Sequence, residues 1–250
     1  MIQSALYREP VPLNSVLHRH KKLQSLTDYS VTRSMHAVFV TAGEFPLAAL
    51  DFPLIFVNTG ERLADGRAMV SPVAMLGLST NENLQLDGPR WTARYLPAFI
   101  RRYPFLTAGV GGEGAPGVFV DAAWSGFNDE QGEPLFDADG QPTAALTHAI
   151  EFLQHFDVEQ LRTREFCTRL VALDILKEMQ AQATLPQGEN VKVEGFLTVD
   201  EEKLNALPDA TVLELHRNGM LMLLHAHLMS LANLKQLVER KAARQATAVA

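Results

Sequence analysis

Residues 34 to 60, SMHAVFVTAGEFPLAALDFPLIFVNTG, place two β-rich apolar runs on either side of a segment with helical character. The runs SMHAVFVTA (34–42) and PLIFVNTG (53–60) are rich in Val, Ile and Phe and lie next to Gly or Pro, as strands usually do. The segment EFPLAALDF between them is long enough for one or two helical turns. The pattern predicts a strand, a short helix and a strand in succession.

The N-terminal half contains further strand candidates of the same kind. GRAMVSPVAMLGL (66–78) and GVFVDAAW (117–124) are short apolar runs that begin at Gly. Gly and Pro interrupt helices and are common where strands meet turns. The chain up to about residue 125 is therefore predicted to be strand-rich.

The C-terminal half changes to helical periodicity after DADGQPT. Apolar residues recur at helical spacing in two groups, Ala145, Ala149, Leu153 and Phe156, then Phe166, Leu170 and Leu173. Between the groups Asp157 stands three residues before Gln160, which is the spacing of a capping box at the start of a helix. We therefore predict two helices with a boundary at Asp157.

One late strand and three helices complete the chain. VKVEGFLTVD (191–200) returns to strand character. Asp200 can cap a helix over EEKLNAL, Asp209 can cap one over ATVLELHRN, and Gly219 suits the end of the latter. The last helix is predicted from about Leu221 to Ala243, with a stripe of leucines facing the core.

Length and composition favour one domain. The chain has 250 residues, of which 47% are hydrophobic and 20% are charged, which is enough for one sizeable core. No internal repeat and no flexible linker separates the two halves. We predict a single α+β domain over residues 1–250, in which a strand-rich N-terminal half packs with a helical C-terminal half and the strands form a mixed sheet.

Charge and cysteine content exclude several classes of protein. The formal net charge of −7 argues against a nucleic-acid binder, which needs a positive surface. A single cysteine, Cys167, rules out an intramolecular disulfide framework and is interpreted as a buried, inert thiol. The start MIQSALYREPVPL has neither the apolar region nor the cleavage site of a signal peptide. We expect a cytoplasmic protein, for which a cell-surface location would need leaderless export.

The most apolar stretch is not predicted to insert into a membrane. MLMLLHAHLMSLANL, from Met220, carries His225, His227 and Asn233, whereas a span would need about 20 largely apolar residues. We interpret it as a core helix.

Two stretches match part of a known motif but lack the context that its chemistry requires. GVGGEG (109–114) has the letters of a dinucleotide fingerprint, but Pro116 and a strand candidate follow where a helix should begin. FDADG (136–140) resembles the start of a calcium loop, but Gln141 replaces an Asp or Asn ligand, the glycine comes too early and His148 replaces the final Glu, so we interpret it as a polar turn. A GxSxG elbow, an HExxH pair and a Walker loop are all missing from the sequence. No cofactor is expected.

The histidines are poorly placed for metal binding or catalysis. His18 and His20 lie in a basic run that would repel a cation. His148 and His155 are two helical turns apart, about 10 Å, which is too far for one metal ion. His227 lies on a helix that is apolar almost all round and is interpreted as a hydrogen-bonded core histidine. No metal is expected.

RWTARYLPAFIRRYPF (90–105) combines four arginines and five aromatic residues with no acid. Pro97 suits the first position of a helix and Pro104 disfavours helical geometry before it, so LPAFIRRY is predicted to be a helix of about two turns. Three side chains of this helix can face the core: Phe99, Ile100 and Tyr103. Arg101 and Arg102 are then predicted to point toward solvent or toward a carboxylate.

Two compatible interpretations of this segment follow. In one, its aromatic residues pack the core and its arginines pair with some of the 29 acidic residues. In the other, it forms a contact surface for a protein or for a small anionic or aromatic ligand, since guanidinium groups bind carboxylates and stack on rings. The candidate binding residues are Trp91, Arg94, Tyr95, Arg101, Arg102 and Tyr103.

Several stretches in a fixed order carry a family resemblance. They are EFPLAALDFPLIFVN, PVAMLGL with NENL close behind, RWTARYLPAFIRRYPF, LFDADGQPT, VEGFLTVDEEKLNALPD and LHRNGMLMLLHAHLMSL. In these stretches the chain resembles the SapC family of bacterial proteins, over about residues 10 to 238. The resemblance implies a bacterial protein, and the family name refers to genes associated with surface-layer proteins. It implies no catalytic residue.

Two classes of function remain open. The first is a non-catalytic accessory or binding protein, which the resemblance links to surface-layer or uptake systems. The second is an enzyme, or the partner of an enzyme, whose pocket is assembled from distant residues such as Arg94, Arg101, Asp121, Trp124 and His227. We favour the first class because the sequence contains no nucleophile motif, metal set or cofactor loop. The sequence does not predict an oligomeric state.

Overall fold

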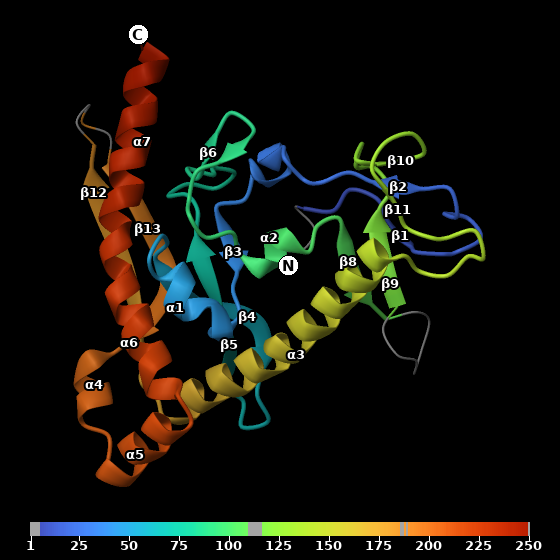
Figure 1. Cartoon of the computed structure of the whole chain (residues 1–250). Helices are drawn as coiled ribbons and strands as arrows, with labels where there is room; N and C mark the ends of the chain where they lie inside the picture. The colour runs from blue at the N-terminus through green and yellow to red at the C-terminus, as the bar shows by residue number, and fades with distance from the viewer. Residues whose placement is uncertain (1–5, 110–116, 186–187, 189, 250) are drawn as a thin grey trace.

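The computed structural model describes residues 6–109, 117–185, 188 and 190–249 (Figure 1). Its strands are β1 Pro10–Pro12, β2 Lys22–Leu23, β3 Ala37–Phe39, β4 Leu54–Arg62, β5 Ala68–Met75, β6 Leu86–Asp87, β7 Arg90–Trp91, β8 Phe105–Ala108, β9 Gly117–Asp121, β10 Phe127–Asn128, β11 Glu133–Pro134, β12 Leu176–Thr184 and β13 Asn190–Val199. Its α-helices are α1 Phe45–Ala48, α2 Ala98–Arg101, α3 Ala144–Ala172, α4 Glu201–Asn205, α5 Asp209–Arg217, α6 Met220–Ser230 and α7 Leu234–Val249. Short 3-10 helices are η2 Tyr29–Thr32, η3 Ala42–Glu44 and η4 Leu231–Asn233. Strands dominate before α3 and helices dominate from α3 onward, so the predicted α+β class is confirmed.

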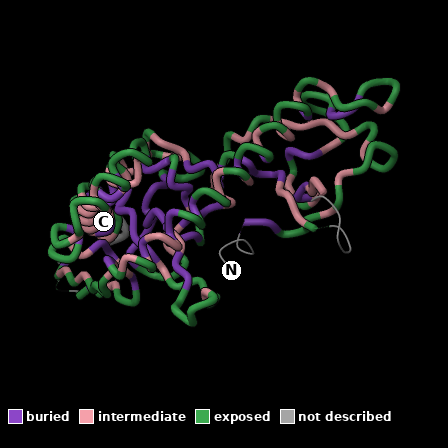
Figure 2. The backbone as a smooth tube through the Cα atoms, turned by 90° about the horizontal axis from the view of Figure 1, so that it is seen from below, coloured by how far each residue is buried: buried purple, intermediate pink, exposed green. Residues whose placement is uncertain are grey.

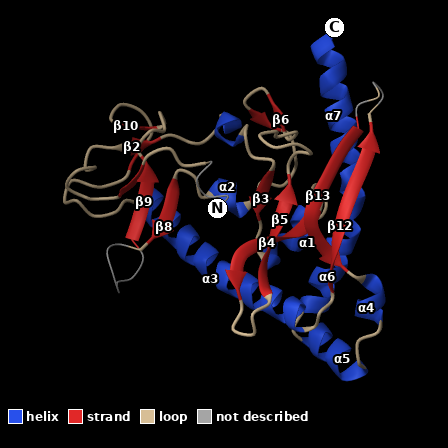
Figure 3. Cartoon of the chain, turned by 180° about the vertical axis from the view of Figure 1, so that it is seen from behind, coloured by secondary structure: helices blue, strands red, loops and turns tan. Residues whose placement is uncertain are grey.

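The largest sheet has five strands in the order β12-β13-β4-β5-β3. Successive residues of a strand point to opposite faces, so Leu54 and Phe56 of β4 join one hydrophobic cluster and Ile55 joins another. Leu237 of α7 packs in the cluster of Ile55, and Figure 3 shows α7 alongside the β12–β13 hairpin. Because both faces of the first part of β4 are covered, the strand begins with a continuous apolar run, whereas its residues 58–62 are exposed.

The predicted succession of strand, short helix and strand is confirmed as β3, α1 and β4. β3 and β4 do not pair with each other, because β5 lies between them and is antiparallel to both. The prediction of a mixed sheet is wrong: every strand pair within the described residues is antiparallel. Parallel neighbours need a long crossover connection. Here the long connection through α1 joins β3 to β4, and these two strands are not neighbours in the sheet.

A second group of strands lies at the other end of the molecule. β1, β9 and β8 form one small sheet and β10, β2 and β11 form another. Their hydrophobic cluster includes Leu146 and Leu153, so the first half of α3 packs here while its second half contacts β5. Figure 2 shows buried segments in both parts, with more of them in the part that carries the C-terminus.

α3 is one continuous helix of 29 residues, so the predicted boundary at Asp157 is wrong. Asp157 does not cap a helix; its Oδ1 accepts a hydrogen bond from Thr107 Oγ1 of β8 at 2.9 Å. Apolar positions before and after Asp157, such as Leu153 and Phe166, are buried against different strand groups. The change of packing partner falls between Leu153 and Phe156, within the first apolar group, and one helix serves both strand groups.

The elements after α3 follow the prediction except at β12, at Asp209 and in the terminal helix. Strand β12 was not predicted, because its exposed, polar sequence has no strand pattern and is ordered by pairing along β13. Asp200 caps α4 as predicted, accepting hydrogen bonds from two amide groups of that helix. Asp209 is the first residue of α5 and not its cap, while Gly219, at φ 80°, follows the end of α5 as expected.

The predicted terminal helix is divided into α6 and α7 by the short helix η4. At this point Ser230 donates to the His227 carbonyl, and Asn233 donates to the carbonyl of Ala49. Leu224 is fully buried, whereas Leu228 is only partly buried. Among the described residues, no helix combines the length and the apolar character that crossing a membrane requires.

Candidate binding site

The segment 90–105 folds into β7, the short helix α2 and the start of β8. Pro97 directly precedes α2, which has a single turn of four residues and is shorter than predicted. The prediction for the inward face is confirmed, since Phe99 and Ile100 of α2 and Tyr103 just beyond it are at most 5% exposed. This packing fixes the position of Arg101 and Arg102, which lie between Ile100 and Tyr103 in the sequence.

The carboxylate of Glu44 holds this segment to the strand and helix that precede β4. One oxygen, Oε1, accepts hydrogen bonds from the Tyr95 hydroxyl at 2.9 Å and from the Ala98 amide at 2.7 Å. The other, Oε2, accepts from the amide and hydroxyl groups of Thr41. Burial, together with the charge of Glu44, raises the pKa of Tyr95 well above its usual range. Tyr95 is therefore a fixed hydrogen-bond donor and not a proton-transfer group.

Arg101 is exposed and is held between two aromatic rings. Its guanidinium carbon lies 5.8 Å from the centroid of Tyr95 and 5.3 Å from that of Phe152 on α3. Its Nη2 lies 3.5 Å from the Tyr95 hydroxyl oxygen. Within the part of the chain that the structure describes, no carboxylate lies within ion-pair distance of Arg101. Its charge is oriented by the rings but is not neutralised.

A hollow of about 420 Å³ opens beside this arginine, between α2, η3 and α3. It is lined by Thr41, Gly43, Glu44, Tyr95, Ala98, Arg101, Phe152, His155, Phe156 and Glu159. We call it the Arg101 hollow. Glu44 is saturated by its four donors, and Glu159 pairs with Arg162 at 2.6 Å. The guanidinium of Arg101 therefore offers the hollow a cation that no described ion pair uses.

Arg102 is buried, so the prediction that it points to solvent or to a carboxylate is wrong. Only 4% of it is exposed, and its guanidinium carbon lies 4.3 Å from the Phe99 ring, 4.8 Å from Phe156 and 5.8 Å from Tyr7. Its Nε and Nη2 atoms have no hydrogen-bond partner among the described residues. Three rings from separate parts of the chain take the place of a counter-ion, which removes Arg102 from the candidate surface.

The other candidates divide between surface and core. Arg94 is 85% exposed and its Nε lies 3.4 Å from Asp51 Oδ1. Trp91 is partly buried, and its indole donates to the Tyr95 carbonyl at 2.9 Å. Tyr103 is buried, and its hydroxyl donates to Asp121 at 2.9 Å. The structure thus brings only Tyr95 and Arg101 of the six candidates into one hollow.

The residues of the alternative enzyme pocket are not assembled into one site. Arg101 and Trp124 line two different hollows. Asp121 and His227 are fully buried. Asp121 accepts hydrogen bonds from Tyr103 and from three backbone amides, so its oxygens serve the fold. These five residues offer no shared surface on which a substrate could meet them.

The remaining sequence candidates behave as structural groups. His227 is buried and its Nε2 accepts from the Val199 amide at 3.0 Å, as expected for a core histidine. Burial raises the pKa of the Cys167 thiol to about 12, which keeps it protonated. Asp137 caps the turn at 136–140 through two backbone amides. Of GVGGEG, only Gly109 lies inside the described residues. In the same described ranges, no group of three or more His, Cys, Asp or Glu side chains is placed to hold a metal ion.

Sequence reasoning missed most of the residues that complete the Arg101 hollow. Thr41 and Glu44 form a capping box at η3, and their T-x-x-E spacing is a signal that the sequence carries. The sequence singles out His155 only as a residue too far from His148 to share a metal ion. Phe152 carries no local signal, because its role under Arg101 depends on the packing of α3 against α2.

Comparison with known protein families supports the resemblance that the motifs along the chain indicate. The SapC family model matches residues 13–237, nearly the whole chain. No curated protein and no solved structure matches it. Because the family model covers far more than half of the sequence, the match is decisive for the family. The chain belongs to the SapC family.

Proposed function

We propose that this SapC-family protein is a non-catalytic binding protein whose site is the Arg101 hollow. The ligand carries an anionic group, such as a carboxylate, next to an aromatic or apolar group. The observation that supports this proposal is an exposed guanidinium that two aromatic rings hold in place without an ion pair.

The arrangement suits recognition because Arg101 is already ordered. A free arginine side chain loses rotamer entropy when it binds a ligand, and that loss weakens binding. Here the rings of Tyr95 and Phe152 hold the guanidinium, and the Glu44 hydrogen bond fixes Tyr95 in turn. Cation–π contact of this kind contributes about 0.5–1 kcal/mol at exposed sites. A ligand carboxylate can then form a forked pair with donors that need little reorganisation.

Two other side chains that line the hollow are expected to make it selective among anionic ligands. His155 is exposed on α3 and lines the same hollow, where its imidazole nitrogens can form hydrogen bonds with a ligand. Phe156 lines it as well, with most of its side chain packed in the core. The anionic group is therefore expected against Arg101 and the apolar part of the ligand against the rings of α3.

The proposal is tested with N-acetyl-L-phenylalanine, which has a carboxylate beside a ring. Its amide, N-acetyl-L-phenylalaninamide, has the ring without the charge, and N-acetyl-L-alanine has the charge without the ring. Titration calorimetry should give the highest affinity for the first compound. Loss of either group should weaken binding by about tenfold or more, or about 1.4 kcal/mol.

Arg101→Gln should abolish the preference for the acid over the amide while changing the free energy of unfolding by less than about 0.5 kcal/mol. Arg94→Gln is the matched control, since Arg94 is an exposed arginine of the same segment that does not line the hollow. Equal affinity for acid and amide in the unaltered protein would refute the proposal. So would an Arg101→Gln variant that binds as well as the Arg94→Gln control.

A further inference from the structure

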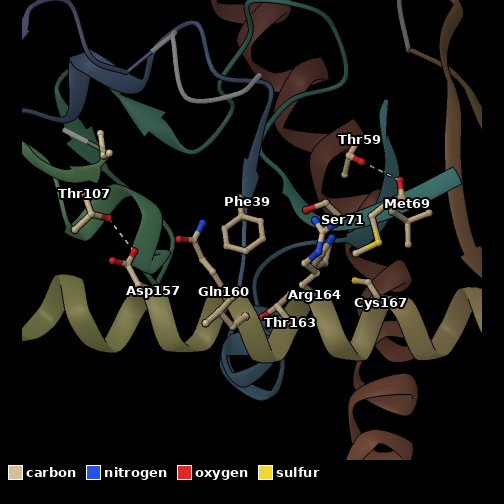
Figure 4. A pocket seen from close by; sticks show the side chains of 15 residues that line it. Phe39, Thr59, Met69, Ser71, Thr107, Asp157, Gln160, Thr163, Arg164 and Cys167 are labelled. Carbon is tan, nitrogen blue, oxygen red and sulfur yellow. Dashed lines mark hydrogen bonds between the residues drawn. The ribbon is translucent and has the colours of Figure 1, made fainter. Parts of the chain in front are cut away.

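A second cavity lies along another side of α3 and shares no lining residue with the Arg101 hollow (Figure 4). It has a volume of about 530 Å³ and lies between α3, β8 and the strands β3, β4 and β5. It is lined by Phe39, Thr59, Met69, Val70, Ser71, Pro72, Thr107, Ala108, Gly109, Asp157, Gln160, Leu161, Thr163, Arg164 and Cys167. We call it the α3 cleft.

The middle of the α3 cleft is apolar. Phe39 stands over α3, and its ring packs edge-on against Phe156 with 6.0 Å between centroids. Met69 is buried, whereas Leu161 is 64% exposed. A leucine that exposed on the wall of a cavity leaves apolar surface for a ligand to cover.

Polar groups lie along the α3 side of the cleft at helical spacing. Asp157, Gln160, Leu161 and Arg164 are at positions i, i+3, i+4 and i+7, so they share one face of the helix. Figure 4 shows the side chains of Gln160 and Arg164 rising from α3 into the cleft, with Asp157 next to Thr107. Seven residues of α-helix span about 10 Å. Asp157 and Arg164 are therefore placed about that far apart along the axis of α3, with Leu161 between them.

Both charged ends keep capacity for a ligand. Asp157 Oδ1 accepts from Thr107 Oγ1 at 2.9 Å, and no described group donates to Oδ2. Arg164 Nη1 lies 2.8 Å from Glu61 Oε2, but both side chains are more than half exposed, so this pair is weak. Its other nitrogen donors remain available. Within the described ranges, the amide of Gln160 and the hydroxyl of Ser71 have no hydrogen-bond partner either.

We propose that the α3 cleft binds a short peptide with free termini, of about three residues. An extended peptide spans about 3.3–3.6 Å per residue, so three residues match the spacing of Asp157 and Arg164 along α3. The ammonium group pairs with Asp157, the carboxylate with Arg164 and the Ser71 hydroxyl, and Gln160 bonds a peptide group between them. An apolar central side chain covers Leu161. This inference is independent of the proposed function, because it uses other residues and another kind of ligand.

The probe is the tripeptide Ala-Leu-Ala, titrated into the full-length protein by calorimetry. Binding should be saturable with one site per chain. N-terminal acetylation removes the charge that Asp157 recognises and C-terminal amidation removes the one that Arg164 recognises, so each should weaken binding by about tenfold or more. Extension to six residues should weaken it too, because the termini then no longer fit between the two charges.

Variants separate the ends of the cleft. Asp157→Asn should remove the preference for a free amino terminus but keep that for a free carboxylate, and Arg164→Gln should do the reverse. Arg162→Gln is the matched control, since Arg162 is an exposed arginine of the same helix that pairs with Glu159 and does not line the cleft. Glu61→Gln should strengthen binding, because it removes the competing partner of Arg164.

Three results would overturn the inference. They are the absence of saturable binding, equal affinity for free and blocked peptides, and loss of binding in Arg162→Gln equal to that in Arg164→Gln. Asp157→Asn keeps the shape of the side chain, and its thermal unfolding is measured beside binding so that a fold defect is not mistaken for a lost contact. Arg101→Gln should bind Ala-Leu-Ala normally, so failure at one site is distinguishable from failure at the other.

Discussion

The guanidinium carbon of Arg102 lies 4.3 Å from the centroid of the Phe99 ring, and both side chains are buried in the core. Phe99 precedes Arg102 by three residues, about one helical turn. The neighbouring Arg101 is exposed instead, over Tyr95 and Phe152. Helical geometry accounts for the difference, because successive residues point about 100° apart. Two adjacent arginines thus have opposite roles, one in packing and one on the surface.

Arg102→Met should retain most of the stability, whereas Arg102→Ala should lose about 2–5 kcal/mol of unfolding free energy, as large-to-small core substitutions do. The reason is that a buried cation without a counter-ion contributes through its contacts with rings more than through its charge. Urea unfolding of both variants measures the difference. If methionine costs as much as alanine, the charge of Arg102 has a partner that the ring contacts do not account for.

Glu44→Gln should lower the free energy of unfolding by about 1–3 kcal/mol. The substitution places an amide group where a carboxylate oxygen now accepts two hydrogen bonds, so at least one buried donor loses its partner. Because Glu44 also fixes Tyr95, affinity for N-acetyl-L-phenylalanine should fall with it. Urea unfolding and calorimetry on the same preparation check both effects, and an unchanged unfolding curve would contradict the first.

Leu224→Ala should cost about 2–5 kcal/mol, because Leu224 is fully buried in the main hydrophobic cluster. Leu228→Ala, one turn further along α6, should cost less, since Leu228 is only partly buried. Denaturant unfolding of the two variants provides its own control, because the substitutions are chemically identical. Equal costs would show that α6 packs differently from this account.

The stability of the protein should fall as the pH drops from about 6.5 to about 4 because of His227. Burial lowers the pKa of His227 to about 4, below its value in an unfolded chain. Between the two pKa values the unfolded state binds a proton at His227 that the folded state does not bind. The stabilisation by neutral His227 is therefore complete above about pH 6.5 and is lost as the pH falls toward about 4, on the order of 3 kcal/mol. Urea unfolding across this range should have a smaller pH slope in His227→Gln, and an unchanged slope would assign the loss to other groups.

Limited proteolysis should not yield two separately stable fragments cut near residue 125 or residue 142. The expectation of one folding unit has support from α3, whose first half packs in the cluster of Leu153 and whose second half packs in that of Phe166. A cut near residue 142 leaves the second group of strands, the small sheets of β1, β9, β8 and of β10, β2, β11, without this helix. Two fragments that each unfold cooperatively after separation would contradict a single domain.

The local sequence pattern was sufficient to predict several elements of the fold. The apolar start of PLIFVNTG became the first part of β4, where both faces are buried, and Asp200 caps α4 because the cap needs only neighbouring amide groups. The burial of Phe99 and Ile100 followed from their place between two prolines.

Features that depend on distant segments were not predictable in this way. Asp157 has the spacing of a helix cap, but its partner is Thr107 of another strand. Arg102 is buried because rings from the N-terminal segment and from α3 meet over it, and nothing adjacent in the sequence indicates this. The Arg101 hollow likewise depends on how α3 packs against α2.

Nuclear magnetic resonance of the arginine side chains tests the central claim most directly, because the Nε–H group of each guanidinium reports on its own surroundings. In a titration with N-acetyl-L-phenylalanine, the Nε–H signal of Arg101, assigned by its loss in Arg101→Gln, should shift in a saturable way. The signal of Arg94 should stay in place, because that residue lies outside the hollow. An Arg101 signal that does not move, or moves no more than that of Arg94, would contradict the claim that the Arg101 hollow is the binding site.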